Sequence, residues 1–255
     1  MADSYVKRGQ PCSKQDYRTI NKRLSFVLGC IGEDKGNLII LDIGTGYGIY
    51  RSNLLSKSAC YIGIDVDESG LKRAQEDDHG ADLVLMSAEH LAFKDDLFDV
   101  VLLIEVLEHV KDDRKALEEI HRVLKPGGLA ILTAPNKLFP FETHGISIGP
   151  RIIGTRGLGF PLLPYLPTPL RERIANARVY TAGNLAKLLT AADLRLDCVD
   201  FIGPSLDTLR INFSGLRIDA LVDLLSRLIH RWESMPVARS ILSTIIVCCE
   251  KVKET

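Results

Sequence analysis

The chain has 255 residues, a formal net charge of −1 at pH 7 and a pI of about 6.6. Apolar residues make up 46% and charged residues 25%, as in ordinary soluble globular proteins, and the balanced charge argues against nucleic acid as a partner. This length suits one large α/β domain, or such a domain with a lid.

From the sequence we expect neither a signal peptide nor a transmembrane helix. The start "MADSYVKRGQ" lacks the apolar stretch of a signal peptide, and no apolar run reaches the roughly 18 residues of a transmembrane helix. The six cysteines form no CxxC pair, so we expect reduced, mostly buried thiols in a cytoplasmic protein. Cys248 and Cys249 are adjacent and should point to opposite faces of a strand.

Periodicity predicts an amphipathic helix over 13–31, followed by short apolar runs that alternate with polar helical stretches. The apolar runs predict five strands, at 37–43, 60–65, 81–86, 98–104 and 128–135. The polar stretches predict three helices, at 47–57, 68–78 and 111–124. Strands without polar alternation, separated by helices, are typical of a parallel sheet covered on both faces. The expected fold is therefore a doubly wound, Rossmann-like α/β domain.

The alternating pattern breaks after the fifth strand. Seven of the eleven prolines lie in or near 137–178, and a segment of this length in a compact domain is usually a functional lid. Further on, we expect a helix with Thr181 as its N-cap, then a strand, a helix and a final strand, at 181–192, 194–203, 215–232 and 241–252. The predicted organisation has four parts: an N-terminal helical segment (1–36), a Rossmann-like cofactor-binding core (37–136), a lid insertion (137–180), and a C-terminal completion of the sheet with an inserted helix (181–255).

A glycine loop, "LDIGTGYG" at 41–48, follows the first strand directly. Glycines let the backbone turn tightly and approach a ligand, and Asp65, at the end of the second strand, is placed to accept from ribose hydroxyls. A dinucleotide site has the spacing G-x-G-x-x-G, whereas this loop has G-x-G-x-G with Asp42 just before it. A carboxylate there repels pyrophosphate and suits a ligand that carries an ammonium and a sulfonium, so a dehydrogenase is disfavoured.

Four stretches, in order, resemble the motifs of class I S-adenosylmethionine (SAM)-dependent methyltransferases, the type 11 and ubiquinone-biosynthesis group. These are "LDIGTGYG", "YIGIDV", "MSAEHLAFKDDLFDVVLLIEVLEHV" and "EIHRVLKPGGLAILTAPN", which cover about residues 38–136. The resemblance implies SAM as the cofactor and a seven-stranded sheet whose last strand is antiparallel. In "LKPGG", Gly127 or Gly128 is expected to cap the C-terminus of a helix.

The resemblance also implies which residues bind SAM. Those residues are Asp42, Gly44, Thr45, Gly46, Tyr47, Gly48, Asp65, Val66, Ser87, Ala88, Glu89, Ile104 and Glu105. The glycine loop would pack on the methionine part, with Asp42 at its amino end. Asp65 would hold both ribose hydroxyls, Val66 would lie against the adenine, and Ala88 would offer it a backbone amide. Many relatives have an acid where Ser87 stands, so Glu89 is the alternative acceptor from the adenine amino group.

The stretch "EVLEH" places Glu105, Glu108 and His109 at the carboxyl end of the fourth strand, and His144 follows the neighbouring fifth strand. Small-RNA 2′-O-methyltransferases show a similar E-x-x-E-H with a later histidine and bind a divalent metal. Three interpretations stay open: a metal site made by these four residues; a metal-free site in which His144 or His109 is the general base and Glu105 assists; or positioning and capping only. Glu142 is interpreted as a solvated loop residue.

The predicted lid mixes apolar residues with four arginines, Arg151, Arg156, Arg171 and Arg173, which suits a lipid-linked or anionic acceptor. The leading prediction is O-methylation of a hydroxyl on a glycan or lipid-linked small molecule. One alternative is O- or C-methylation of a quinone or phenol. An alternative of another class is a non-catalytic SAM-fold binding or scaffold protein. The apolar lid equally suits a homodimer interface or peripheral contact with a membrane.

Overall fold

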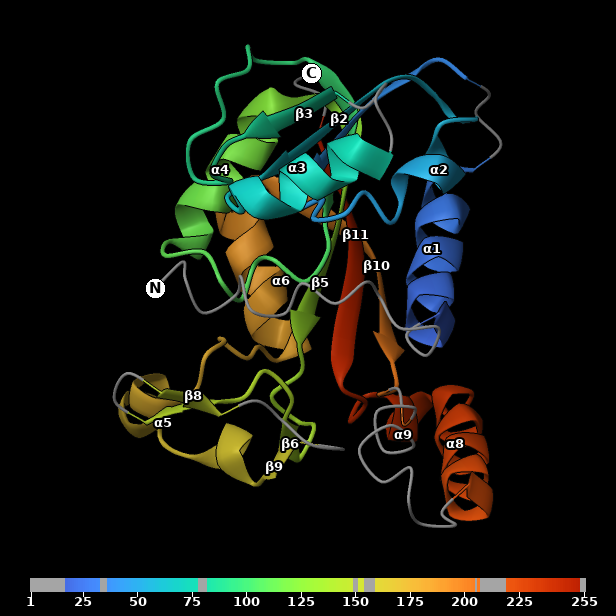
Figure 1. The fold of residues 1–255 in the computed structure, drawn as a ribbon, viewed down its shortest axis with the longest axis vertical. Helices are drawn as coiled ribbons and strands as arrows, with labels where there is room; N and C mark the ends of the chain where they lie inside the picture. The colour runs from blue at the N-terminus through green and yellow to red at the C-terminus, as the bar shows by residue number, and fades with distance from the viewer. Residues whose placement is uncertain are drawn as a thin grey trace.

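The computed structural model describes residues 17–32, 36–77, 82–148, 151–153, 159–204, 206 and 219–252. A seven-stranded sheet with the order β10-β11-β5-β4-β1-β2-β3 forms the centre (Figure 1). Its strands are β1 (Leu38–Ile43), β2 (Ser58–Asp65), β3 (Asp82–Leu85), β4 (Phe98–Leu103), β5 (Leu124–Pro135), β10 (Leu194–Ile202) and β11 (Thr244–Lys251). Only β11 runs in the direction opposite to the other six strands of this sheet. The predicted doubly wound fold with an antiparallel last strand is confirmed.

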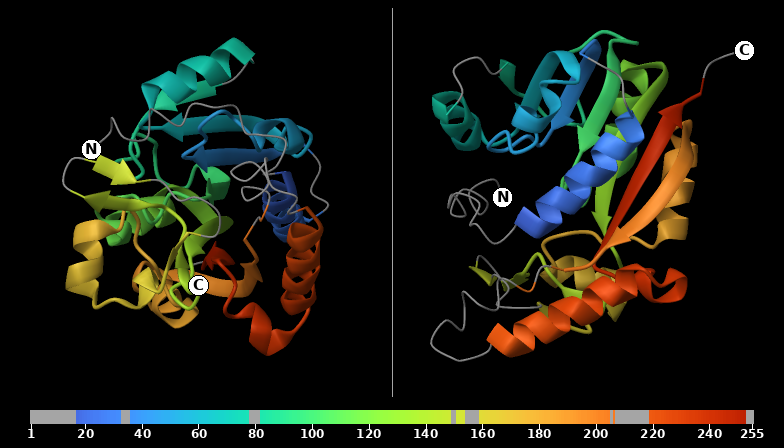
Figure 2. Two further views of the ribbon diagram at one scale, coloured as in Figure 1. Left: turned by 60° about the horizontal axis from the view of Figure 1, so that its bottom comes forward. Right: turned by 90° about the vertical axis from the view of Figure 1, so that its right-hand side faces the viewer.

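The sheet is covered on both faces, which explains why its central strands are continuous apolar runs. Helix α1 (Tyr17–Ile31) packs on one face, and α4 (Asp113–Val123) and α6 (Ala182–Ala191) pack on the other (Figure 2). Successive residues of a strand alternate between the two cores: Val100 belongs to the α1 side and Val101 to the α4 side. Cys248 and Cys249 divide in the same way, as predicted.

Two local predictions are wrong. The helix predicted over 47–57 is only the single turn α2 (Arg51–Leu54), because the backbone at Gly46 and Gly48 has positive φ (53° and 69°) and keeps turning. The expected glycine C-cap is also absent from the described end of α4. That helix ends at Val123 and passes directly into β5, while Gly127 (φ 83°) lies in an irregularity of the β4–β5 register.

Residues 137–180 lie between β5 and α6, and we call them the 137–180 segment. It contains β6 (Phe141–Glu142), β7 (Ile146–Ile148), β8 (Arg151–Ile153), β9 (Phe160–Pro161), the 3-10 helix η3 (Leu163–Tyr165) and α5 (Thr168–Ile174). Its two ends meet, because Lys137 N donates to Tyr180 O (2.7 Å) and Tyr180 N donates to Pro135 O (2.9 Å). Both ends of the segment therefore lie just beyond the carboxyl end of β5 (Figure 1).

The C-terminal part completes the sheet, and its described residues also form the helices α8 (Asp219–Glu233) and α9 (Pro236–Arg239). Thr181 caps α6 as predicted, since its side chain accepts from Asn184 N (3.1 Å). Helix α8 begins at Asp219, and residues 215–218 of the predicted helix lie outside the described residues. In the described part of the chain, no helix combines the length and the apolar character needed to cross a bilayer. The first turn of the predicted N-terminal helix, 13–16, also lies outside the described residues.

Candidate active site

The glycine loop begins where β1 ends, between β2 on one side and β4 on the other. This is the switch point at which doubly wound sheets bind ligands. Gly44 has φ of 74°, and a Cβ there would lie 2.1 Å from Val106 Cγ2. Only glycine therefore lets this loop pack against the segment that follows β4. A Cβ on Gly46 would meet no heavy atom within 4 Å, so the outer side of the loop leaves room for a ligand.

Asp65, at the end of β2, faces the same loop. Its Oδ2 accepts from Gly46 N and its Oδ1 from Asp67 N, both at 2.9 Å. A carboxylate has about four acceptor sites, so the half-buried side chain keeps capacity for further donors such as hydroxyls. The next residue, Val66, is 69% exposed. An apolar platform thus stands beside an acid with free acceptor sites, which suits a nucleoside.

Asp42 lies deeper than its predicted role requires. It is 2% exposed and accepts a hydrogen bond from the Tyr61 hydroxyl on β2. Burial raises the pKa of Asp42 to about 6, although the Tyr61 hydrogen bond opposes the rise. At this depth Asp42 would act on a cofactor amino group through water or through a neighbouring side chain.

Ser87, Ala88 and Glu89 follow β3 and form one connected turn. Ser87 Oγ contacts Glu89 Oε2 (3.4 Å) and accepts from Glu89 N (3.3 Å), while Glu89 Oε1 accepts from Asp112 N (2.7 Å). Ala88 is buried. One oxygen of the Glu89 carboxylate therefore accepts a hydrogen bond from the segment before α4, and the other oxygen accepts from the Ser87 hydroxyl. Ile104, 7% exposed, lies at the end of β4, where a ligand at the switch point would rest.

Glu105 is held in an unusual conformation directly after β4. Its φ of 59° is rare for a residue with a side chain, and such strain persists mainly at functional sites. Its N–H donates to Thr133 Oγ1 (2.8 Å), and its Oε1 accepts from Arg23 Nη2 (2.7 Å). Burial alone would raise the pKa of Glu105, but the charges of Arg23 and His144 outweigh burial and lower it to about 2.

Arg23 is a site residue that the sequence reasoning missed. It comes from α1, and its Nε is buried without a hydrogen-bond partner. The sequence could have indicated this role, because Arg23 lies three residues after Ile20 and four before Val27 and so shares the face of α1 that packs against the sheet. A cation on that face requires an anionic partner.

His144 reaches from the 137–180 segment to the residues that follow β4. Its Nε2 lies 3.3 Å from Glu108 Oε1 and 3.8 Å from Glu105 Oε2, and its Nδ1 lies 3.4 Å from Glu142 Oε1. Burial alone would lower the pKa of His144, but the surrounding carboxylates outweigh burial and raise it well above its ordinary value. The His109 ring packs edge-on against it, with centroids 5.3 Å apart.

The interpretation of Glu142 as a solvated loop residue is wrong. Glu142 is 2% exposed, and its Oε1 accepts from His144 N (2.9 Å). Its other oxygen, Oε2, is buried without a hydrogen-bond partner. Glu142 therefore holds the imidazole of its neighbour in place.

Glu108, His109 and His144 are grouped tightly enough to share one ion. One ligand atom from each lies within 4.8 Å of the others. The Glu108 side chain is fully buried, and neither of its oxygens has a hydrogen-bond partner, so the contact with His144 is close but poorly aligned. A buried carboxylate without aligned donors is costly and requires a nearby positive charge, which the His144 imidazolium supplies in this structure and a bound metal ion would supply in its place. Two imidazoles and a carboxylate form a donor set that fits a divalent metal, whereas Glu105, engaged by Arg23, lies at the edge of the group.

Residues 41–132 match a family described as "Methyltransferase domain". An uncharacterized methyltransferase of Mycolicibacterium vanbaalenii is 34% identical over 127 residues, which cover 49% of this chain and 50% of that protein. A ubiquinone biosynthesis O-methyltransferase of Parvibaculum lavamentivorans is 33% identical over 116 residues, which cover 44% of this chain and 45% of that protein. The chain spans about half the length of the curated relatives it matches.

The fold is shared more widely than the sequence. The structure of an S-adenosylmethionine-dependent methyltransferase from Mesorhizobium loti superposes with a TM-score of 0.59 at 17% identity. The superposition covers 89% of this chain and 97% of that one. At this identity the likeness establishes a common architecture and leaves the reaction to be argued from the site.

Proposed function

Because residues 41–132 form a class I SAM-dependent methyltransferase domain, we propose that this chain transfers the methyl group of SAM to a hydroxyl oxygen. The acceptor that we propose is a glycan or a lipid-linked small molecule. One observation carries the proposal: the glycine loop and Asp65 leave a ligand face at the sheet's switch point, and Glu105, Glu108, His109 and His144 gather at the same edge.

In this proposal the two ends of SAM meet separate sets of residues. Asp65 takes the ribose hydroxyls, Val66 supports the adenine, and the open side of the glycine loop receives the methionine part. Glu105 supplies a negative charge for the ammonium, while the Arg23 guanidinium, with its unpartnered Nε, supplies a positive charge for the carboxylate. The observed Arg23–Glu105 pair is thus a preformed receptor for an amino acid.

Arg23→Ala should weaken SAM binding by about tenfold, because a charge-assisted hydrogen bond contributes roughly 1.5–3 kcal/mol. The measurement is a calorimetric titration with SAM and, in parallel, with decarboxylated SAM. The variant should lose affinity for SAM only, since the decarboxylated ligand offers nothing to the guanidinium. Lys57→Ala is a control that also removes a cation, because the Lys57 ammonium donates to Gly32 O (2.8 Å) and not to Glu105. An equal loss for both ligands would contradict the assigned contact.

Methyl transfer from a sulfonium needs the acceptor oxygen in line with the methyl group and relieved of its proton. Glu108, His109 and His144 would hold a divalent metal, which when bound supplies Lewis-acid activation of the acceptor hydroxyl. Glu142 fixes the ring of His144 through Nδ1, so that Nε2 faces Glu108. Glu105 and Arg23 hold the cofactor end, and burial keeps the Glu108 and Glu142 carboxylates from water.

The 137–180 segment is our proposed acceptor-binding region. It exposes several apolar side chains, namely Leu138, Ile153, Leu162, Tyr165 and Leu170. The arginines were predicted to bind an anionic or lipid-linked acceptor, but Arg171 is only 5% exposed and its Nη1 donates to Ala177 O (2.8 Å). Arg173 is exposed, Arg156 lies outside the described residues, and the side chain of Arg151 is not among those described. The apolar surface therefore favours a lipid-linked acceptor over one recognised by charge alone.

A panel of acceptors tests this function. The full chain, supplied with methyl-labelled SAM and a divalent metal, should label a prenyl-linked glycan that has free hydroxyls. A substituted catechol forms the second arm, since one relative carries the name of a ubiquinone biosynthesis O-methyltransferase. If only the catechol is labelled, the acceptor is a phenol and not a glycan or lipid-linked hydroxyl. SAM binding without label on any hydroxyl of either class would contradict O-methyl transfer.

A further inference from the structure

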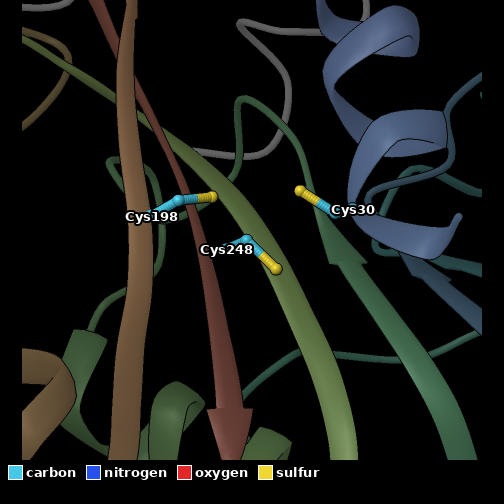
Figure 3. A group of neighbouring side chains, drawn as sticks. All are labelled: Cys30, Cys198 and Cys248. Carbon is cyan, nitrogen blue, oxygen red and sulfur yellow. The ribbon is translucent and has the colours of Figure 1, made fainter.

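Three cysteines from distant parts of the sequence meet on the α1 face of the sheet, away from the glycine loop. Cys30 lies near the end of α1, Cys198 on β10 and Cys248 on β11 (Figure 3). Cys198 and Cys248 are cross-strand partners, and Cys248 belongs to the core that α1 covers. In the described residues the cysteines are free, and only Cys248 and Cys249 are buried, so the prediction of mostly buried thiols is wrong. Cys12 lies outside the described residues.

The three sulfur atoms lie within 4.8 Å of one another. Thiolates bound to one ion at about 2.3 Å stand about 4 Å apart, so small side-chain rotations would bring these three into coordination. Among the described residues, no fourth cysteine, histidine or acid belongs to this group. Three sulfur donors, with no oxygen or nitrogen donor among them, select soft ions such as Cu⁺, or Zn²⁺ with water in the fourth position.

We propose that Cys30, Cys198 and Cys248 form a trithiolate site for a thiophilic metal ion, separate from the candidate active site. The geometry favours ligation, because Cys198 and Cys248 are cross-strand partners and the sulfur of Cys30 approaches both of them from α1 (Figure 3). Cys198 is exposed, which gives an ion a route to the site. Binding of the ion displaces the thiol protons to solvent.

The site would join α1 to the two strands at the end of the sheet. Cys30 follows Arg23 by seven residues, two helical turns, so both residues project from the same side of α1. An ion held by Cys30 therefore fixes the helix that presents Arg23 to Glu105. Because a ligand that binds only the folded state stabilises it, the metal should also raise the melting temperature.

The test uses the full, reduced, metal-free chain, with Zn²⁺ added in one arm and Cu⁺ added without oxygen in the other. To separate the two candidate metal groups, the Zn²⁺ arm also uses Glu108→Gln, in which we expect one ion per chain. As the ion is added to the native chain, the number of thiols that react with a thiol reagent should fall and the melting temperature should rise. X-ray absorption should show sulfur neighbours at about 2.3 Å. Cys30→Ser, Cys198→Ser and Cys248→Ser should each weaken binding by at least about tenfold, since each removes one of three ligands.

Cys60→Ser and Cys249→Ser are the matched controls, because both cysteines lie outside the group. They should bind the ion as the wild type does. Three results would each overturn the proposal. The first is an equal loss of ion affinity in the controls, and the second is that no ion binds in either arm. The third is a Cys30–Cys198 or Cys30–Cys248 disulfide that persists under reducing conditions and blocks the ion. Glu108→Gln, which alters the other candidate metal group, should leave thiol-dependent binding unchanged.

Discussion

Asp65→Ala should weaken SAM binding by about 100-fold, the largest loss expected from any single cofactor contact. The reason is that two charge-assisted hydrogen bonds to the ribose hydroxyls disappear together, each contributing roughly 1.5–3 kcal/mol. Asp65→Asn keeps the shape and one acceptor oxygen, so its loss should be intermediate. Calorimetric titration with SAM, and with S-adenosylhomocysteine, measures both variants.

The control for Asp65 is Asp95→Ala, which removes an exposed carboxylate that pairs with Arg122 far from the loop. It should bind SAM as the wild type does. Because Asp65 also accepts from Gly46 N, the melting temperature of each variant must be recorded alongside its affinity. If Asp65→Ala binds SAM within about threefold of the wild-type affinity, Asp65 does not belong to the cofactor site. A threefold change corresponds to less free energy than one charge-assisted hydrogen bond contributes.

Glu108→Gln and His144→Ala should each lower methyl transfer by about 100-fold or more while leaving SAM affinity nearly unchanged. Neither side chain contacts Asp65 or the glycine loop. His144 does approach Glu105 (3.8 Å), but Glu105 keeps its closer ion pair with Arg23 (2.7 Å), so the loss should fall on turnover. Chelator treatment should abolish transfer by the wild type, and Mn²⁺ or Mg²⁺ should restore it.

Titration of Mn²⁺ into chelator-treated protein, with S-adenosylhomocysteine present, provides a readout independent of turnover. One ion should bind the wild type and none should bind Glu108→Gln at the same concentration. His90→Ala is the matched control, because this exposed histidine contacts Lys115 and no acid of the cluster. Full activity of the chelator-treated wild type would remove the metal from the account, and wild-type turnover of His144→Ala would remove that residue.

Much of the fold follows from the sequence because its strands are short apolar runs buried on both faces. The predicted strand over 98–104 corresponds to β4 at Phe98–Leu103, and the predicted cap of α6 is the observed one. Local glycine geometry was harder to foresee. The sequence over 47–57 predicted one continuous helix, but the positive φ angles of Gly46 and Gly48 are incompatible with a right-handed helix, so the helix begins only at Arg51.

The site shows the same limit more clearly. Glu108 follows β4 and His144 follows β5, and these two strands are neighbours, so the sequence could predict that the two side chains approach each other. In the structure His144 Nε2 lies 3.3 Å from Glu108 Oε1. No local spacing connects Arg23 with Glu105, which are 82 residues apart, so that ion pair arises only from the packing of α1. Glu142 looked solvated because acids in proline-rich loops usually are, but the segment folds back and buries it against His144.

A calorimetric titration of the full chain with SAM tests the proposed cofactor site most directly. We expect one binding site with a dissociation constant on the order of 1–100 µM, and a lower affinity in Asp65→Ala but not in Asp95→Ala. Absence of any binding heat with millimolar SAM, confirmed by an unchanged melting temperature, would contradict it.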